Sequence, residues 1–237
     1  MNSRAVIRFE KAGFAVVPDI LDEDEVCEIS RQLEFLGTAN AGTRRLLNEP
    51  WCRGLGQRLA RDIRLSNLIP HDACAVQCTY FTKSSTHNWL VTLHQDLSIP
   101  VADRIDSEHC SGWSRKEGGL FVQPPSSFLE DILAVRIHLD DTNDESGALR
   151  IVPGSHALGR LTAEAIQRVR DELGEVTVPV LRGGAMVMRP LLLHASHKVC
   201  VDRPRRVLHF VYGPSNLPCG LRWPPSDGIS DGTVIPA

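Results

Sequence analysis

Two side chains that can bind a metal ion stand close together in the middle of the sequence. His94 and Asp96 lie within residues 88–101, whose apolar and β-branched residues predict a β-strand. Side chains two residues apart on a strand point to the same face, so this imidazole and this carboxylate would project together. They would make two of the three ligands of the facial set that binds non-haem Fe(II). Such a pair also occurs by chance, and an exposed polar loop is the preferred interpretation unless the chain supplies a third ligand.

His194 can be that third ligand. It lies in the apolar run 191–196, which predicts a late strand, and a lone histidine in such a strand is usually a packed residue of the core or its rim. An antiparallel jelly roll, however, brings an early and a late strand side by side. A histidine from each strand and one aspartate then complete the facial set. The sequence therefore predicts an Fe(II) site at His94, Asp96 and His194.

A facial triad leaves three metal positions open, of which a 2-oxo acid can take two and O2 the third. The distal carboxylate of 2-oxoglutarate then needs a cation, preferably a planar one that forms two hydrogen bonds. Arg205 opens the predicted strand 205–213, eleven residues after His194. Strand alternation puts Arg205 and Arg206 on opposite faces without showing which one points inward. A solvated charge near a strand end is the alternative for Arg205.

Four motifs follow one another in a characteristic order: His94-Gln-Asp96, Gly147–His156 with its Pro-Gly-Ser-His turn, Arg189–Ser196 and Arg205–Phe210. Together they resemble the phytanoyl-CoA dioxygenase family of Fe(II)/2-oxoglutarate oxygenases over roughly residues 8 to 223. The resemblance implies a double-stranded β-helix, Fe(II) at the three ligands above, and 2-oxoglutarate with O2 as co-substrates. It also implies that Arg205 and Ser196 bind the distal carboxylate. Gln77 and Thr79 lie on the strand that usually lines the co-substrate, although ordinary strand residues fit there equally.

The same resemblance implies an oxidoreductase, a dioxygenase that hydroxylates or otherwise oxidises a C–H bond of a small molecule such as a secondary metabolite. Succinate and CO2 would be released. Trp89, Trp113, Arg136 and His209 are expected to line the substrate pocket, and packing in the core is the alternative for the tryptophans. Relatives often have an aromatic residue where this chain has Arg136. Arg136 could therefore contact 2-oxoglutarate or substrate, or pair structurally with Asp140 or Asp141.

The remaining pattern describes the scaffold. Amphipathic helices are predicted at 21–36, with an Asp22–Glu25 capping box, at 49–64 and at 162–173, and a short β element within 5–20. Short strands are predicted at 73–81, 88–101, 132–139, 148–152, 176–181, 185–196 and 205–213. Residues 102–127 read as a long loop and a possible lid. This order predicts a mainly β, cupin-like jelly roll with flanking helices. We expect one domain over 1–237, with the N-terminal helices in about 21–64 and the jelly-roll core in about 73–213.

Composition narrows the setting. A formal net charge of -3 over 237 residues argues against nucleic-acid or membrane partners, and seven scattered cysteines suggest a reducing, cytoplasmic protein. We expect a monomer or homodimer that binds a small molecule. Two alternatives stay open: a non-catalytic metal- or 2-oxoglutarate-binding module, and a cupin-like isomerase or hydrolase on the same fold. The chain lacks the His-x-His motif typical of cupins.

Overall fold

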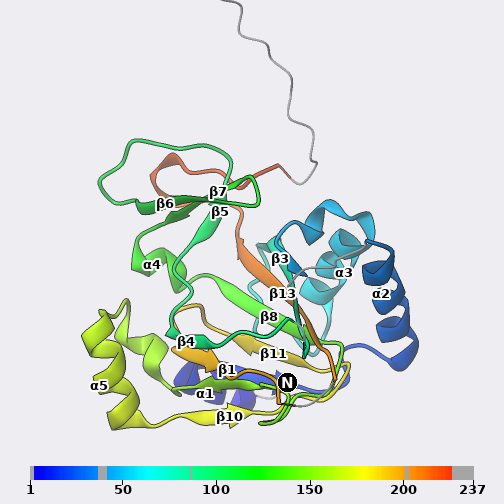
Figure 1. The fold of residues 1–237 in the computed structure, drawn as a ribbon. Coiled ribbons are helices and arrows are strands. Elements are labelled where there is room, and N and C mark those ends of the chain that lie inside the picture. The colour runs from blue at the N-terminus through cyan, green and yellow to red at the C-terminus, as the bar shows by residue number, and fades with distance from the viewer. Residues whose placement is uncertain (1–2, 37–41, 86, 201–202, 226–237) are drawn as a thin grey trace, which may run out of the picture.

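The computed structural model describes residues 3–36, 42–85, 87–200 and 203–225, and its strands form two main antiparallel sheets (Figure 1). The predicted mainly β jelly roll is confirmed. The larger sheet has the order β1 (Phe14–Val17), β11 (Ala185–Met188), β8 (Leu133–His138), β13 (Arg205–Pro214), β3 (Ala73–Lys83) and β2 (Gly42–Thr43). The smaller sheet has the order β10 (Val176–Val178), β9 (Leu149–Ile151), β12 (His194–Ser196) and β4 (Val91–His94).

Helices cover the outer face of the larger sheet. In Figure 1, α2 (Glu23–Phe35) and α3 (Pro50–Arg61) lie together on that side, and their apolar residues share a core cluster with β8 and β13. The predicted capping box starts α2, because the Asp22 carboxylate accepts from the Glu25 N–H at 2.8 Å and the Glu25 carboxylate accepts in return. The remaining helical elements are α1 (Ser3–Ala12), η1 (Leu46–Asn48), α4 (Ser126–Leu129), η2 (Ser155–Leu158), α5 (Ala163–Leu173) and η3 (Pro218–Gly220).

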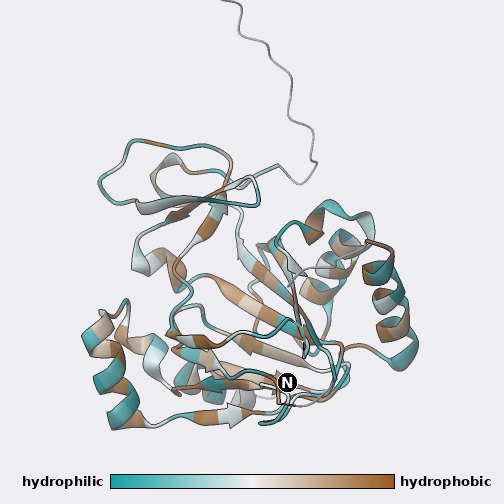
Figure 2. Cartoon of the chain, in the orientation of Figure 1, coloured by the Kyte–Doolittle hydropathy of each residue, from teal (hydrophilic) through white to brown (hydrophobic). Residues whose placement is uncertain are grey.

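The two faces of strand β8 have different surroundings. Leu133, Val135 and Ile137 pack on the helix side, whereas Ala134 and Arg136 face the interior of the jelly roll. All six residues of the strand are buried. Figure 2 shows the hydrophobic character of β8 and the mixed surfaces of the helices, which are typical of amphipathic helices over a sheet. No helix among the described residues is long and apolar enough to cross a membrane.

The prediction of a long loop at 102–127 was wrong. Strands β6 (Ser111–Lys116) and β7 (Gly119–Gln123) form a hairpin, and with β5 (Ile99–Val101) they make a separate three-stranded sheet. Its two-residue turn, Glu117-Gly118, has positive φ at both positions, as the tight hairpin turns that match strand twist require. The residues of β6 are mostly polar and partly exposed, so they show no alternation of apolar and polar residues that would predict a strand.

Three other boundaries differ from the prediction. Residues 3–12 form α1, and only 14–17 of the expected β element within 5–20 form a strand. The predicted strand 185–196 divides into β11 and β12, which belong to different sheets, with the turn 189–193 between them. The predicted strand 88–101 divides into β4 and β5 in the same way. In each case the apolar sequence runs on without a break, but its two halves form hydrogen bonds in different sheets. A hydrophobicity pattern therefore predicts one long strand where the structure has two.

Candidate metal centre

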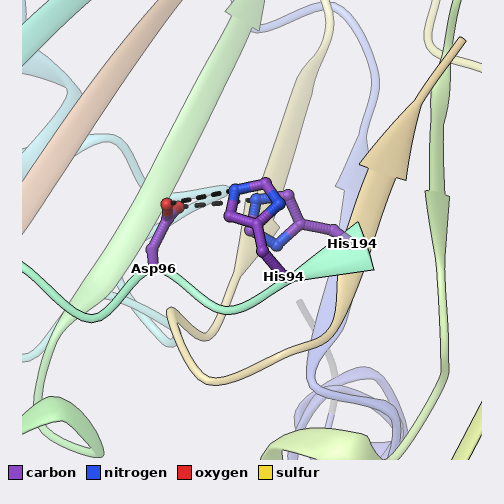
Figure 3. Close-up of side chains that lie close together, drawn as sticks. All are labelled: His94, Asp96 and His194. Carbon is purple, nitrogen blue, oxygen red and sulfur yellow. Dashed lines mark ion pairs between the residues drawn. The ribbon is translucent and has the colours of Figure 1, made fainter. Parts of the chain in front are cut away.

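The three predicted ligands converge on one point between the sheets. His94 ends β4, His194 begins β12, and the two residues face each other in the antiparallel register of these strands. Their ring centroids are 4.3 Å apart. The Asp96 carboxylate lies 3.7 Å from Nε2 of His94 and 3.6 Å from Nε2 of His194 (Figure 3). One ligand atom from each residue lies within 4.8 Å of the others, so the set could hold a metal ion such as iron.

Hydrogen bonds to the backbone set the orientation of both imidazoles. Nδ1–H of His94 donates to the Thr92 carbonyl at 2.8 Å, and Nδ1–H of His194 donates to the Leu192 carbonyl at 2.9 Å. Because a carbonyl oxygen only accepts, each ring must carry its proton on Nδ1. The Nε2 lone pairs are therefore left free and face Asp96. Metal-bound histidines are commonly held by such outer hydrogen bonds, which fix the tautomer and the ring direction.

Asp96 reaches the site by a route that strand alternation did not predict. The backbone leaves β4 after His94, and the Asp96 N–H donates to the Pro190 carbonyl at 2.9 Å. The side chain of Gln95 holds this bend, because its amide nitrogen donates to Gly159 and Leu191 at 2.8 and 2.7 Å. The shared face of a strand thus correctly predicted that these side chains meet, but the turn 189–193 is what positions the carboxylate.

The electrostatics at His194 and Asp96 favour the protonation states that metal binding requires. Burial lowers the pKa of His194 to about 4, although the Asp96 carboxylate opposes part of that shift. Burial alone would raise the pKa of Asp96, but electrostatic interactions with His194, His209, His94 and Arg136 hold it below its usual value. Neutral imidazoles and an ionised carboxylate are the forms that coordinate Fe(II).

A cavity of about 430 Å³ opens over the three ligands, within the usual range for small-molecule sites. Most of the residues predicted to contact the co-substrate or the substrate line it: Gln77, Thr79, Trp89, Arg136, Ser196, Arg205 and His209. Trp113 does not. It lies on β6, packs within the three-stranded sheet and has the Arg104 guanidinium 5.4 Å from its ring centroid. Its position therefore does not support a role in the substrate pocket.

Arg205 is the inward-pointing arginine of β13. It is 4% exposed, one Nη donates to the Gly147 carbonyl, and Nε has no partner among the described residues. Burial and the charge of Arg136 lower its pKa to about 9. Gly147 has a φ of +72°, and a Cβ there would lie 2.9 Å from the His197 carbonyl, so the turn that presents this acceptor requires glycine. Arg206 points the other way and pairs with Asp140 at 2.8 Å.

The sequence analysis missed Lys83, which faces Arg205 across the β3–β13 register. Its side chain is fully buried, and its ammonium donates to Ser196 Oγ at 2.9 Å and to the His197 carbonyl at 3.0 Å. Burial, with the charges of Arg205 and Arg136, lowers its pKa to about 7. Since Ser196 Oγ accepts from this ammonium, its own proton is available to a ligand in the cavity. Continued alternation from Gln77 and Thr79 to residue 83 would have placed Lys83 on the inner face.

The fold and the cluster of His94, Asp96 and His194 define a jelly-roll protein with a candidate metal site of the two-histidine, one-carboxylate type. The sequence profile of the phytanoyl-CoA dioxygenase (PhyH) family matches residues 9–207, and the chain belongs to this family. No curated protein matches the sequence. Solved structures with the same fold include enzymes described as non-heme and alpha ketoglutarate dependent, each about one-fifth identical to this chain.

Three of these structures illustrate the likeness. The non-heme epimerase SnoN from nogalamycin biosynthesis, in complex with Fe3+, alpha ketoglutarate and nogalamycin RO, has a TM-score of 0.71 and 19% identity, covering 98% of this chain and 91% of its own. The carbocyclase SnoK from the same biosynthesis has a TM-score of 0.68 and 18% identity, covering 98% and 89%. HygX from Streptomyces hygroscopicus, with nickel and 2-oxoglutarate bound, has a TM-score of 0.62 and 20% identity, covering 91% and 88%.

Proposed function

We propose that this protein is an Fe(II)- and 2-oxoglutarate-dependent oxygenase that oxidises a C–H bond of a small molecule, of the kind found among secondary metabolites. The observation that carries the proposal is the combination of two features in one cavity. Two imidazoles and one carboxylate meet with their ligand atoms within 4.8 Å of one another, and the buried Arg205 guanidinium beside them has no carboxylate partner among the described residues.

Each part of the cavity has a defined task in this proposal. His94, Asp96 and His194 would hold the iron on one face. Bound iron and 2-oxoglutarate would supply the activation of O2 that drives C–H oxidation, with release of succinate and CO2. Arg205 would bind the distal carboxylate through its free N–H groups, and the Ser196 hydroxyl would donate to the same carboxylate. Gln77 and Thr79 lie on the adjacent strand, where their polar groups can contact the co-substrate.

The charge balance of the clamp favours a dianionic co-substrate. Lys83 and Arg205 are buried neighbours, and neither has a carboxylate partner among the described residues. Buried cations without partners are costly, because the charge loses its hydration without recovering an ion pair. A ligand carboxylate at Arg205 would remove this penalty. A cupin-like isomerase or hydrolase has no need of such a clamp.

The finer question is which product forms at the attacked carbon of the substrate. Hydroxylation is the direct outcome of C–H oxidation in this class. Two solved structures of the same fold are described as an epimerase and a carbocyclase, both alpha ketoglutarate dependent. Stereochemical inversion or ring closure at the attacked carbon is therefore included in the proposal as an alternative outcome to hydroxylation.

Anaerobic titration of the metal-free protein with Fe(II) and then 2-oxoglutarate tests the proposal. A chelated 2-oxo acid gives a visible charge-transfer band, which should appear in the wild type. His94→Ala should abolish it, whereas His109→Ala, which removes an exposed histidine outside the cavity, should not. Iron binding without the band would refute 2-oxoglutarate as the co-substrate. Absence of iron binding would refute the metal site itself.

A further inference from the structure

The cavity carries more positive charge than its carboxylates would balance, even with iron and 2-oxoglutarate bound as proposed. Its lining includes four cationic side chains, Arg44, Lys116, Arg136 and Arg205, whereas Asp96 is the only carboxylate among the described residues that line it. Arg44 already pairs with Glu117 at 2.9 Å. Lys116 has no carboxylate within ion-pair distance in the described part of the chain, and its Nζ lies 4.8 Å from the Phe121 ring centroid.

Arg136 is a buried cation of this cavity that has no carboxylate partner among the described residues. It is 5% exposed, and within the described structure its side chain makes one hydrogen bond, from Nη1 to Nδ1 of His209 at 2.8 Å. Its Nε is buried without a partner. The structural alternative that it pairs with Asp140 is excluded, because Asp140 binds Arg206 on the opposite face of the sheet. A guanidinium carries five N–H donors, so most of them are available to a ligand.

Two neighbours hold this guanidinium in place. Because Arg136 can only donate, His209 must accept at Nδ1 and is therefore neutral, and burial followed by the Arg136 charge lowers the pKa of His209 to about 3. The guanidinium carbon also lies 5.7 Å from the Phe81 ring centroid, within cation–π distance. A buried charge fixed on two sides and open on the others is preorganised for an oxyanion.

Counting charges identifies which oxyanion this is. In the proposed function, on which this inference rests, Asp96 and the chelating carboxylate of 2-oxoglutarate balance the two charges of iron. The distal carboxylate balances Arg205. Lys116 is only partly buried, so water can solvate its charge, whereas Arg136 is then the one buried cation among the described lining residues that has no negative counterpart. A buried unpaired charge is strongly unfavourable. A single carboxylate on the substrate would balance it, whereas a phosphate monoester carries close to two charges at neutral pH.

We propose that Arg136, oriented by His209 and Phe81, is a carboxylate-binding subsite for the substrate, so that the enzyme acts on small-molecule acids. The planar guanidinium suits a carboxylate, which can accept two parallel hydrogen bonds. Lys116 lies at the same cavity on the three-stranded sheet, where its charge attracts the incoming acid. The Arg136 position thus determines which substrates are accepted and leaves the chemistry to the metal.

The test uses the zinc-substituted protein saturated with 2-oxoglutarate, and calorimetric titration with benzoate and its uncharged analogue benzamide as probes. Benzoate should bind at least about tenfold more tightly than benzamide, and Arg136→Gln should weaken benzoate binding by at least about tenfold, the usual range for a charge-assisted contact. Arg136→Lys, which keeps the charge, should retain part of the preference. Arg168→Gln removes an exposed charge on α5 and should change neither affinity.

The affinity for 2-oxoglutarate separates the possible outcomes. It should stay within about threefold of wild type in Arg136→Gln if the subsite serves the substrate. A loss of 2-oxoglutarate affinity as large as the loss for benzoate would assign Arg136 to the co-substrate and overturn the inference. Binding of 2-oxoglutarate without any preference for benzoate would overturn the inference alone. If wild type fails to bind 2-oxoglutarate, the proposed function fails and this inference with it.

Discussion

Replacing the buried Lys83 with methionine should change how the stability of the protein depends on pH. Methionine has a similar length and no charge, so Lys83→Met removes the ammonium while filling the same space. The ammonium is fully buried, with hydrogen bonds to Ser196 and the His197 carbonyl and no carboxylate partner among the described residues. Its pKa falls from the usual 10.5 of a solvated lysine to about 7 because of burial and the charges of Arg205 and Arg136.

The sign and size of the effect follow from proton linkage. Below pH 7 the lysine is protonated in both the folded and unfolded chains, so folding bears the full penalty of burying the charge. Between pH 7 and about 10.5 the unfolded chain holds a proton that the folded chain has released, so wild-type stability rises with pH. Each pH unit in this window contributes about 1.4 kcal/mol. From pH 6 to pH 9, wild type should gain about 3 kcal/mol relative to Lys83→Met.

Urea unfolding of the metal-free proteins at pH 6, 7, 8 and 9, at constant ionic strength, measures this difference directly. Using the difference between the two proteins cancels the titration of groups that they share. Lys198→Met is the matched control, since Lys198 is exposed two residues after Ser196. A difference between wild type and Lys83→Met that stays constant across this pH range would refute the argument that burial depresses the pKa of Lys83.

Three other substitutions test the site and the scaffold. Arg205→Gln should raise the Kd for 2-oxoglutarate about 10- to 150-fold, the range for a lost charge-assisted hydrogen bond, as measured by calorimetry on the zinc form; an unchanged Kd would remove Arg205 from the clamp. Asp96→Ala should abolish turnover and weaken Fe(II) binding by more than about 100-fold. Asp106→Ala, which removes an exposed carboxylate, should do neither. Full activity in Asp96→Ala would contradict the ligand assignment. Tyr212→Phe should lower the free energy of unfolding by about 1 kcal/mol in urea, because its hydroxyl donates to the Gly56 carbonyl at 2.8 Å within the core; no loss would mean that this bond adds nothing to stability.

Local sequence patterns predicted the scaffold where short-range physics controls it. The capping box at Asp22 and Glu25 starts α2 as expected, because the two residues satisfy each other's backbone N–H groups within one helical turn. Helix α5 begins after Thr162 and ends before Gly174 for similar local reasons. The hairpin of β6 and β7 was missed because its stabilising contacts are remote. Its sheet packs with Leu221 and Trp223, about one hundred residues later in the chain.

Periodicity alone could not decide which face of a strand points into the cavity. Alternation separated Arg205 from Arg206, but the inward direction follows from how β13 packs against the helices through Leu208 and Phe210. Lys83 follows the same rule. Its neighbour Ser196 is 113 positions away in the sequence, so their contact exists only after β3 and β12 have been brought together. Trp113 had a suitable side chain for a pocket, yet it packs against the hydrophobic cluster of the three-stranded sheet and does not line the cavity.

The sequence by itself determined the types, order and spacing of the candidate metal ligands and most of the succession of helices and strands, because these depend on side-chain chemistry and local backbone preference. The tertiary structure alone decided the rest. It placed Asp96 through the Gln95 contacts to Gly159 and Leu191, aimed Arg205 inward, and left Arg136 buried with no carboxylate partner among the described residues. The physical reason is that burial and charge balance are properties of the whole assembled cavity, whose walls come from strands far apart in the chain.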